Sequence, residues 1–434
     1  MDENKNTINY DIDTTIKYDI DTTINYDIDT TIKYDIIIIG FGISGIAMAK
    51  ESIKRKKKIL ILEKETNGGG VWFSCHKNSE LQSHKTFYEY TQEETMSKSI
   101  SNYPNKSEIL IYLEKIIKKY KLNNYVKYNC KVETLEKHNN EYLINKKYKS
   151  KFVAICCGVN NNINKIDKLN DYRGELYYSK YLTNYNFDKI NNNTNKSNKL
   201  NESNKSKNIL VIGNGASACD VIKNIDNINP NLKIICLYKK EKYFIDKYIF
   251  GLPISIFLNE MILLFFNKIH LTFYRIIVKL VNIIFFKNAL NIPNEKININ
   301  NLIGSNIINK KIKNGSLSYI NDTIEFSYKK NIICSKNIFL NVDIIFCCNG
   351  YNNKLRFMNC DIPINRYLGI FHQNFKNIGV IGYNPSYNWP KISEKQSIIF
   401  LDYIEGKMNI NKYYEKKIKD KYDYTYNLYD YLKL

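Results

Sequence analysis

Two glycine-rich turns, each between a short apolar run and a helix-like segment, most constrain the fold of this chain. The first is IIIIGFGISG, residues 36–45, and the second is ILVIGNGASA, residues 209–218. In such a turn the first glycine allows a sharp bend and the second lets the backbone approach a pyrophosphate. A third small residue lets the helix pack closely on the strand. The pattern predicts two βαβ units of the dinucleotide-binding kind in one α/β chain.

An acidic residue follows the first turn at an informative distance. The turn contains Gly40, Gly42 and Gly45, and Glu63 ends the next apolar run, 18 residues beyond Gly45. A carboxylate at this place can accept hydrogen bonds from both ribose hydroxyls of an adenosine and would repel a 2′-phosphate. The first turn therefore predicts a site for FAD or NAD rather than NADP. The alternative is a strand–turn–helix that holds no ligand.

The second turn is followed by cations instead. Gly213, Gly215 and Ala218 form this turn, and the next apolar run ends in YKK, residues 238–240. Cations there can pair with a 2′-phosphate, so the turn predicts an NADPH site. The alternative is a pair of solvated lysines in a Lys-rich chain. Two dinucleotide sites in one chain imply hydride transfer from a nicotinamide to a bound flavin.

The composition narrows the class of protein. A chain of 434 residues with 44% hydrophobic residues is long enough for two or three domains and is not wholly disordered. The formal net charge of +21 suggests an anionic partner. However, the lysines are scattered and accompany an abundance of Asn, Ile and Tyr, so we expect no nucleic-acid partner.

The ten cysteines show no spacing typical of a metal site. They form no CxxC pair and most lie in apolar, strand-like runs, which predicts reduced, packed thiols in a cytoplasmic protein and no metal. A flavin disulfide reductase would need a redox-active pair. Cys75 has no partner at such a spacing, and Cys156 and Cys157 are adjacent. Electron transfer from a flavin to O₂ is therefore the better prediction.

Two internal segments and the N-terminus depart from the α/β pattern. Residues 186–207 are rich in Asn, Ser and Lys, which predicts a flexible inserted loop. Residues 248–286 are strongly apolar, but charges interrupt them before the roughly 18–20 residues needed to span a bilayer. We expect buried helices or a pocket wall there; the alternative is peripheral contact with a membrane such as the endoplasmic reticulum. The acidic N-terminus has no apolar core, so we expect no secretory signal.

Residues 7–38 contain four copies of an eight-residue unit, TINYDIDT and its variants. The first three copies alternate apolar and polar residues, which is typical of a half-exposed strand. In the fourth copy Ile37 stands where the others have Asp, and this gives the two-sided apolar character that a covered parallel strand needs. We expect the fourth copy to form the first strand and residues 1–30 to be a disordered or loosely attached extension.

The rest of the chain alternates strand and helix patterns. Residues 107–122 have apolar positions at helical spacing, and Ser107 can cap this helix. Residues 149–158 read as a buried strand that ends in glycine. This alternation places the chain in the α/β class.

A series of motifs resembles the flavin-containing monooxygenases, especially their plant-like members. EKETNGGGVW, which carries Glu63, Gly70 and Trp72, is similar to the E-x5-GG-x-W signature of that family. LQSHKTFYEY, YRGELYYS, GNGASACD, FGLPISIFLNE, CNGY and EKQ then follow in the family's order. The resemblance covers about residues 34–407.

The resemblance implies an α/β fold of two Rossmann-like dinucleotide-binding domains, with the NADPH domain inserted in the FAD domain. We expect the repetitive extension at residues 1–30 and the FAD domain in residues 31–175 and 335–434. The NADPH domain is expected in residues 176–334, with the low-complexity loop inside it.

The resemblance also implies an activity. NADPH reduces FAD, O₂ adds to give a C4a-hydroperoxide, and a nucleophilic N or S of a small organic substrate takes one oxygen atom. This sequence differs from the family's F-x-G-x-x-x-H motif, because Tyr178 replaces the His and Leu182 stands where the family has an aromatic residue. These departures keep open a Baeyer–Villiger-type ketone monooxygenase or an uncoupled NADPH oxidase. A non-catalytic dinucleotide-binding protein is a further alternative.

The positions that match the family fall into four groups. The FAD group is Gly40, Gly42, Ser44, Gly45, Glu63, Lys64, Gly70 and Trp72. The NADPH group is Gly213, Gly215, Ser217, Ala218, Tyr238, Lys239 and Lys240, with Lys239 where the family usually has Arg, and the domain junction has Gly350 and Tyr351. The candidates for the reacting site are Gln82, Ser83 and His84. A neutral His84 could donate the hydrogen bond that an Asn gives in animal-type members; the alternative is an incidental loop residue.

Overall fold

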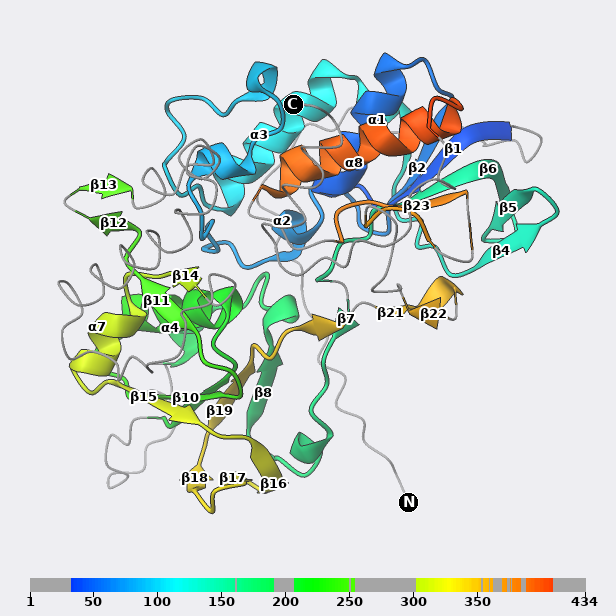
Figure 1. The fold of residues 1–434 in the computed structure, drawn as a ribbon. Helices are drawn as coiled ribbons and strands as arrows, with labels where there is room; N and C mark the ends of the chain where they lie inside the picture. Colours follow the sequence, from blue (N-terminus) through cyan, green and yellow to red (C-terminus); the bar gives the residue numbers. More distant parts are fainter. Residues whose placement is uncertain are drawn as a thin grey trace, which may run out of the picture.

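The computed structural model describes residues 33–160, 162–190, 207–249, 251–253, 302–352, 354–358, 360–361, 369–372, 375, 377–383 and 388–408. Two separate β-sheets, each with its own helices, organise this part of the chain (Figure 1). The first sheet has the order β3-β2-β1-β6-β5-β4, with β23 beside β6. Its strands are β1 Lys33–Ile39, β2 Ile59–Leu62, β3 Val126–Lys127, β4 Leu135–His138, β5 Glu141–Ile144, β6 Tyr148–Ile155 and β23 Ile378–Val380.

The fourth copy of the repeat forms β1, in the middle of the first sheet, between β2 and β6, and both pairings are parallel. Ile36 and Ile38 are buried in the core on one face of the sheet, and Ile37 and Ile39 in the core on the other. The prediction that this copy supplies a two-sided apolar strand is confirmed, because a central parallel strand is covered on both faces. The three earlier copies lie outside the described residues.

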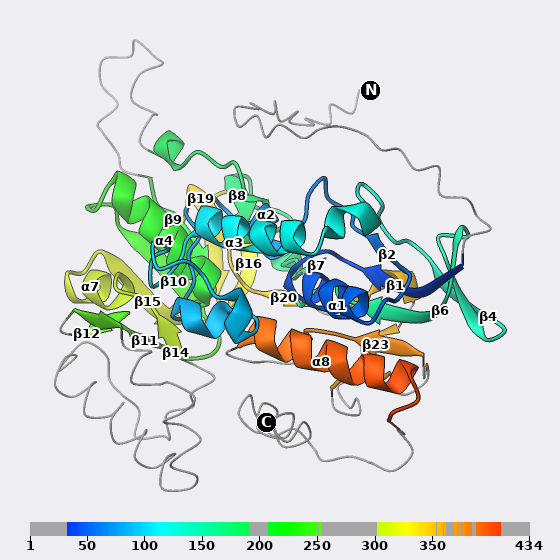
Figure 2. The same cartoon turned by 90° about the horizontal axis from the view of Figure 1, so that it is seen from above.

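Three helices cover one face of the first sheet: α1 Ile43–Lys54, α3 Lys106–Lys119 and α8 Trp389–Ile404. Figure 2 shows them side by side, although α8 lies far from the other two in the sequence. The predicted cap of α3 is wrong. Asn105 caps this helix, because its side chain accepts a hydrogen bond from the Glu108 amide (3.1 Å) and Glu108 reciprocates (2.9 Å). Ser107 lies inside the first turn.

The second sheet is parallel throughout, in the order β15-β10-β9-β19-β8. Its strands are β8 Glu175–Tyr178, β9 Ile209–Ile212, β10 Ile234–Tyr238, β15 Leu317–Asn321 and β19 Ile344–Cys347, and its helices are α4 Ala216–Ile228 and α7 Ile308–Lys313. Each side of this sheet has its own hydrophobic core. The two glycine turns therefore begin two separate α/β units, as the sequence predicts.

The second unit is inserted into the first. After β19 the chain returns to the first sheet, where β23 pairs with β6 and α8 packs near α1. The boundary predicted at residue 335 differs from the structure, because β19 pairs with β9 and β8 in the second sheet. We call residues 33–160 and 369–408 the first unit and residues 175–347 the second unit, within the described ranges.

Shorter elements complete the described chain. The helical ones are α2 Val71–Ser74, η1 Lys85–Tyr88, η2 Gln92–Glu94, η3 Leu122–Tyr125, η4 Asp167–Leu169, η5 Ser179–Tyr181, η6 Phe187–Ile190 and η9 Arg356–Met358. The strands are β7 Asn162–Ile163, β11 Tyr243–Ile245, β12 Tyr248–Ile249, β13 Leu252–Pro253, β14 Leu302–Gly304, β16 Ile324–Tyr328, β17 Asn331–Cys334, β18 Phe339–Asn341, β20 Tyr351–Asn352, β21 Lys354–Leu355 and β22 Cys360–Asp361.

The two unusual internal segments are described only in part. The loop predicted at residues 186–207 begins as the short helix η6, whose Phe187 and Ile190 are buried in the core of the second unit. The flexible-loop prediction is therefore wrong for these first residues, and residues 191–206 lie outside the described part. Most of residues 248–286 also lies outside it. Among the described residues, no helix is long and apolar enough to cross a bilayer.

The central position of β1 gives a direct test of the repeat. The substitution Ile37→Asp gives the fourth copy the residue found in the other three. A carboxylate would then be buried in the middle of the first sheet without a partner, which costs several kcal/mol and approaches the whole stability of a typical domain. We expect loss of soluble protein or a large fall in the unfolding midpoint in urea. The control is Ile111→Asp on α3, where the side chain is 63% exposed and we expect a change below about 1 kcal/mol. Equal stabilities of the two variants would contradict this role of β1.

Candidate active site

The first glycine turn is built as the sequence predicts. Gly40 has a φ of +98°, and a Cβ there would lie 2.7 Å from the carbonyl oxygen of Cys156. A Cβ on Gly45 would clash with the carbonyl oxygen of Gly40, so α1 can start this close to the end of β1 only with glycine at both positions.

A second backbone segment crosses the first turn at Gly70. A Cβ on Gly70 would lie 2.9 Å from the Cα of Gly42, and Gly70 has a φ of +59°. Gly69 donates a hydrogen bond to the carbonyl oxygen of Phe41 (2.9 Å), which fixes the crossing. The two glycines leave bare backbone beside the start of α1. Such a surface is what a pyrophosphate needs for close approach, so these residues fit a dinucleotide.

Glu63 follows β2 directly and is buried beside the same turn. One carboxylate oxygen accepts a hydrogen bond from the Phe41 amide (2.6 Å) and the other from the Glu65 amide (2.9 Å). Burial raises the pKa of the Glu63 carboxyl, and these two hydrogen bonds oppose that shift. Each carboxylate oxygen can accept a further hydrogen bond, so the group can still receive ribose hydroxyls. Lys64, the next residue, is exposed.

The remaining predicted FAD residues connect the turn to its surroundings. The indole N–H of Trp72 donates to the hydroxyl of Tyr88 (2.5 Å), and both side chains are buried. The hydroxyls of Ser44 and Ser393 are hydrogen-bonded (3.0 Å), which ties α1 to α8. The predicted FAD group is therefore gathered around the start of α1, with α8 beside it.

The second glycine turn has the same form but more space. Gly213 has a φ of +103° and packs against the carbonyl oxygen of Cys348. A Cβ added to Gly215 would meet nothing within 4 Å, so the surface above this residue is open. Ser217 and Ala218 lie in the first turn of α4, and Ala218 is buried. The open start of α4 can receive a pyrophosphate.

The predicted cationic residues lie at the end of β10. Tyr238 stacks on Tyr319 with ring centroids 4.0 Å apart, and the Asn214 side chain donates to the Tyr319 hydroxyl (2.6 Å) and to the carbonyl oxygen of Lys240 (2.8 Å). These contacts hold the strand end against the turn. Lys239 and Lys240 are exposed there, where a phosphate can reach them.

The junction residues reach the second turn. Gly350 has a φ of +84°, and the neighbouring Asn349 side chain donates to the carbonyl oxygen of Asn164 (2.8 Å). The Tyr351 hydroxyl hydrogen-bonds to Ser179 and Ser217, and burial raises its pKa. The structure thus brings Tyr351 and Ser217, both predicted to bind cofactor, into contact.

The two positions that depart from the family motif have structural roles here. The Tyr178 hydroxyl accepts a hydrogen bond from the Ile166 amide (3.4 Å). Leu182 is buried in the hydrophobic core of the second unit. An apolar side chain at position 182 is thus explained by packing.

The loop with the three reacting-site candidates lies in the first unit. His84 caps η1: its Nδ1 contacts the Thr86 hydroxyl (2.9 Å), and its Nε2 lies 3.3 Å from Oδ1 of Asn102. Burial lowers the pKa of His84, and Lys85 adds to this effect. Both ring nitrogens are therefore engaged by side chains of the first unit.

Gln82 differs from His84 in having an unused acceptor. Its Oε1 is buried, and no described residue donates a hydrogen bond to it. Its Nε2 makes a long contact with the carbonyl oxygen of Glu80 (3.4 Å). A buried amide oxygen without a donor is unusual and costs free energy, which makes Gln82 the strongest of the three candidates for contact with a ligand. Ser83 lies between the two and is partly buried.

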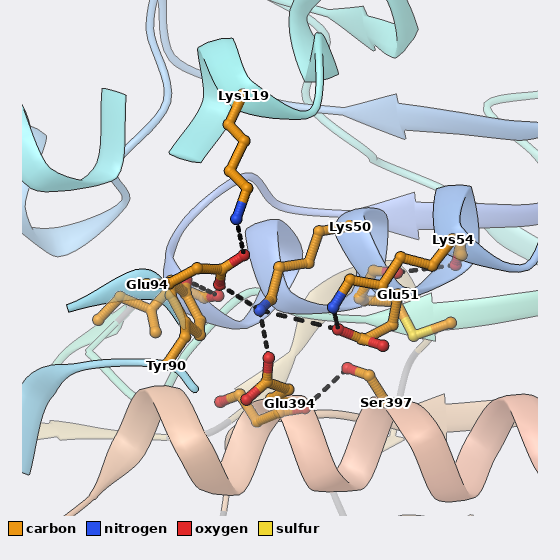
Figure 3. A network of polar contacts seen from close by, with 12 residues as sticks. Lys50, Glu51, Lys54, Tyr90, Glu94, Lys119, Glu394 and Ser397 are labelled. Atoms are coloured by element: carbon orange, nitrogen blue, oxygen red, sulfur yellow. Dashed lines mark hydrogen bonds and ion pairs between the residues drawn. The ribbon is translucent and has the colours of Figure 1, made fainter. Parts of the chain in front are cut away.

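A buried charge cluster that was not predicted from the sequence lies between α1 and α8 (Figure 3). Lys50 is fully buried, and its ammonium pairs with Glu394 of α8 and with Glu94 (2.5 Å). The same ammonium lies 4.6 Å from the centre of the Tyr90 ring, and Lys119 reaches Glu94 from α3 (3.5 Å). The one feature of the sequence that could have indicated this cluster is a lysine, Lys50, at a position of α1 that faces the core.

A second missed cluster lies between the two units. Glu80 of the first unit pairs with Lys247 and Lys223 of the second unit, each at 2.7 Å. Next to this pair, the Asn78 and Asn224 side chains are hydrogen-bonded (2.5 Å). These residues are distant in sequence, and no local pattern indicates that they meet.

Comparisons with known proteins agree with this architecture. Residues 34–239 match the family model described as pyridine nucleotide-disulphide oxidoreductase. The structure of a flavin-containing monooxygenase from Stenotrophomonas maltophilia superposes with a TM-score of 0.60 at 12% identity, covering 86% of this chain and 99% of that one. The structure of cyclohexanone monooxygenase from Rhodococcus sp. Phi1 bound to NADP⁺ superposes with a TM-score of 0.61 at 16% identity, covering 86% of this chain and 84% of that one. The chain therefore has the two-domain fold of flavin-dependent monooxygenases, and the fold prediction is confirmed.

The sequence relatives point to the same family. A putative flavin-containing monooxygenase 2 of Arabidopsis thaliana is 33% identical over 101 residues, which is 23% of this chain and 22% of that protein. The chain spans only about a third of the length of two further relatives, both FAD-binding monooxygenases of fungi. The resemblance of this chain to flavin-containing monooxygenases is thereby confirmed.

The interface between the units contains a carboxyl whose titration can be tested. Burial raises the pKa of Asp220 on α4 to about 7, and Glu80 adds to the shift, while Ser79, Lys247 and Lys223 oppose it. Because the pKa of an unfolded Asp is about 3.9, the folded state favours the protonated form. The resulting stabilisation is fully present below about pH 4 and is lost as the pH rises through 7.

We expect Asp220→Asn to remove this dependence. The variant should gain thermal stability relative to the wild type as the pH rises from 4 to 8, by about 4 °C or more at the upper end. Thermal unfolding followed by circular dichroism across this range measures the difference. The control is Asp188→Asn, where the side chain is exposed and the difference should stay flat. A flat difference for Asp220→Asn as well would contradict the assignment.

Proposed function

We propose that this protein is an NADPH- and O₂-dependent FAD monooxygenase that oxygenates a nucleophilic N or S of a small organic substrate. The observation that carries the proposal is the pair of glycine turns, one at the end of β1 and one at the end of β9, in two units joined by direct contacts. When bound, FAD supplies the redox chemistry, accepting electrons from NADPH and activating O₂. The protein binds and orients both dinucleotides and limits the access of water.

Support for FAD in the first unit comes from Glu63 and the Gly42–Gly70 crossing. The buried carboxylate is fixed by two backbone amides and can accept ribose hydroxyls, and the bare backbone leaves room for the pyrophosphate. A 2′-phosphate beside Glu63 would be repelled, so we assign NADPH to the second unit.

Support for NADPH in the second unit comes from the open surface over Gly215 and from the exposed Lys239 and Lys240. The lysines supply charge for a 2′-phosphate but lack the planar fork of an Arg guanidinium. We therefore expect a preference for NADPH over NADH that is looser than an Arg would give.

The thiols favour O₂ over a disulfide as the electron acceptor. Burial raises the pKa of Cys157 to about 12 and also raises the pKa of its neighbour Cys156 well above its ordinary value. A redox-active pair needs an accessible thiolate, and thiols with such raised pKa values do not provide one. This argues against disulfide reduction, although the family model that matches the chain carries that word in its description.

Ketone oxygenation of the Baeyer–Villiger type is the second candidate. The superposition on cyclohexanone monooxygenase favours it to the same degree as the likeness to flavin-containing monooxygenases. The departures at Tyr178 and Leu182 also keep an uncoupled NADPH oxidase under consideration. A non-catalytic dinucleotide-binding protein is the fourth candidate, and the two intact glycine turns argue against it.

One set of measurements separates these candidates. We expect the purified protein to be yellow and to lose its visible absorption when NADPH is added under argon. In air, NADPH consumption should rise with one class of substrate among amines, thioethers and ketones, without an equal rise in H₂O₂. NADPH consumption matched fully by H₂O₂ release would favour the uncoupled NADPH oxidase. A purified protein that binds no flavin would contradict the proposal.

The second unit offers a sharper test of cofactor choice. We expect Lys239→Ala to raise the KM for NADPH about tenfold, the equivalent of one lost charge-assisted contact, and to leave the KM for NADH nearly unchanged. Steady-state NADPH and NADH oxidation measures both constants. Lys233→Ala, an exposed lysine at the other end of the same strand region, is the matched control. Equal changes with both nucleotides would show that Lys239 does not read the 2′-phosphate.

A further inference from the structure

Lys247 lies between β11 and β12 in the second unit, yet its side chain is buried against the first unit. Its ammonium donates to a carboxylate oxygen of Glu80 (2.7 Å) and to the carbonyl oxygen of Leu81 (2.7 Å). The same ammonium lies 5.0 Å from the centre of the Tyr103 ring. A buried ammonium with two oxygen partners and an aromatic face is held at one place.

The backbone of Lys247 is fixed as well. Its amide donates to the side chain of Asn306 (2.7 Å), and its carbonyl oxygen accepts from the hydroxyl of Tyr103 (2.5 Å). Tyr103 belongs to the first unit and Asn306 to the second. Lys247 is therefore bound on both sides of the boundary between the units.

Glu80 is held by a second lysine from another element. Its other carboxylate oxygen accepts from Lys223 (2.7 Å) on α4, the helix that begins at the second glycine turn. The helix α4 thus contacts Glu80 through Lys223, whose side chain is 41% exposed. Two lysines, from α4 and from the β11–β12 connection, converge on one carboxylate.

The residues that follow Glu80 and Leu81 are the reacting-site candidates. The carbonyl oxygen of Gln82 lies so close to Gly304 of β14 that a Cβ there would be 2.6 Å away. The rings of His84 and Tyr103 are in a T-shaped arrangement, with their centroids 6.2 Å apart and their planes at 90°. The same Tyr103 that binds Lys247 therefore also supports the far end of the loop.

We propose that Lys247 is a positioning residue that fixes the segment 80–84 relative to the NADPH site. This inference rests on the proposed function, because it assigns the segment to the flavin side of the reaction. Without the ammonium, the Leu81 carbonyl oxygen and one oxygen of Glu80 lose their donor, and of the two lysines only the partly exposed Lys223 still pairs with Glu80. A displacement near 1 Å at a reacting site costs about 100-fold in rate, so the coupled reaction depends on this contact.

The test compares Lys247→Met with the wild-type holoprotein and with two further variants. Lys247→Arg keeps the charge and should restore most of the behaviour. Lys223→Met leaves the buried Lys247–Glu80 pair intact and should have a much smaller effect. Bound FAD per chain, read from the visible spectrum, first confirms that each variant is folded.

The first readout is independent of turnover. Hydrogen exchange of the backbone amides of residues 79–86 is measured with and without NADP⁺. We expect NADP⁺ to protect this segment in the wild type and in Lys247→Arg. Lys247→Met should lose at least about 80% of that protection, because the segment loses its buried anchor on the second unit. Unchanged protection in Lys247→Met would overturn the proposal.

The second readout separates oxygen transfer from NADPH oxidation. With thioanisole as the probe, we expect Lys247→Met to raise the H₂O₂ released per NADPH at least about threefold, with a KM for NADPH within about threefold of the wild type. Equal H₂O₂ ratios in both proteins would also overturn it. Failure of the wild type to bind FAD or to be reduced by NADPH would instead defeat the proposed function, and the exchange experiment would still decide whether Lys247 holds the loop.

If Lys247→Met proves insoluble, Glu80→Gln removes the charge and one of the two acceptor oxygens, so that only one of the two lysines keeps its hydrogen bond to this side chain. We expect it to lose part of the NADP⁺-dependent protection at residues 79–86. Full protection together with an unchanged H₂O₂ ratio in Glu80→Gln would contradict the role of this ion pair.

Discussion

The fold of the first unit depends on one buried ammonium. Lys50 of α1 and Glu394 of α8 are 344 residues apart in the chain, and Glu94 joins them from a third segment (Figure 3). Burial raises the pKa of Glu394, and the nearby ammonium opposes that shift. Losing one partner would leave an unpaired buried charge, which typically costs about 3–5 kcal/mol. The Ser44–Ser393 hydrogen bond and the Arg55–Asp402 ion pair (2.7 Å) tie the same two helices on either side of Lys50. The return of the chain to its first sheet is therefore specified by polar contacts as well as by packing.

This closure determines how the second unit is held. Because both ends of the insertion are connected to the first unit, the second sheet can form its own hydrophobic cores and still stay in place. The side chains that the structure shows across the boundary are mainly polar: Glu80 with Lys223 and Lys247, Asn78 with Asn224, and His76 near the carbonyl oxygen of Tyr185 (3.3 Å). Polar contacts fix the relative orientation of the two units while each unit keeps its own hydrophobic core.

What the sequence could predict was local. The glycine turns, the parallel βαβ units and the selection of the fourth repeat copy follow from residue types within a few positions, because β1 needs apolar residues on both faces. What it could not predict depends on partners far along the chain. Asn105 rather than Ser107 caps α3, because its side chain and that of Glu108 form a reciprocal pair of hydrogen bonds. The strand β19 belongs to the second sheet because it pairs with β8 and β9. Neither the partners of Lys50 nor the two lysines on Glu80 have any sequence signal of their own.

The same distinction applies to the reacting site. His84 is the residue that chemistry alone would choose, yet its two ring nitrogens contact the side chains of Thr86 and Asn102 in the first unit. Gln82 has the buried acceptor without a described donor, and its neighbour Leu81 carries the carbonyl oxygen that Lys247 binds. An unsatisfied acceptor beside a rigid anchor is the arrangement expected where a ligand completes the hydrogen bonding. Under the proposed function the cofactor supplies the reactivity, so the contribution of the chain is the placement of this short loop, and the structure shows that contacts from one unit to the other hold it.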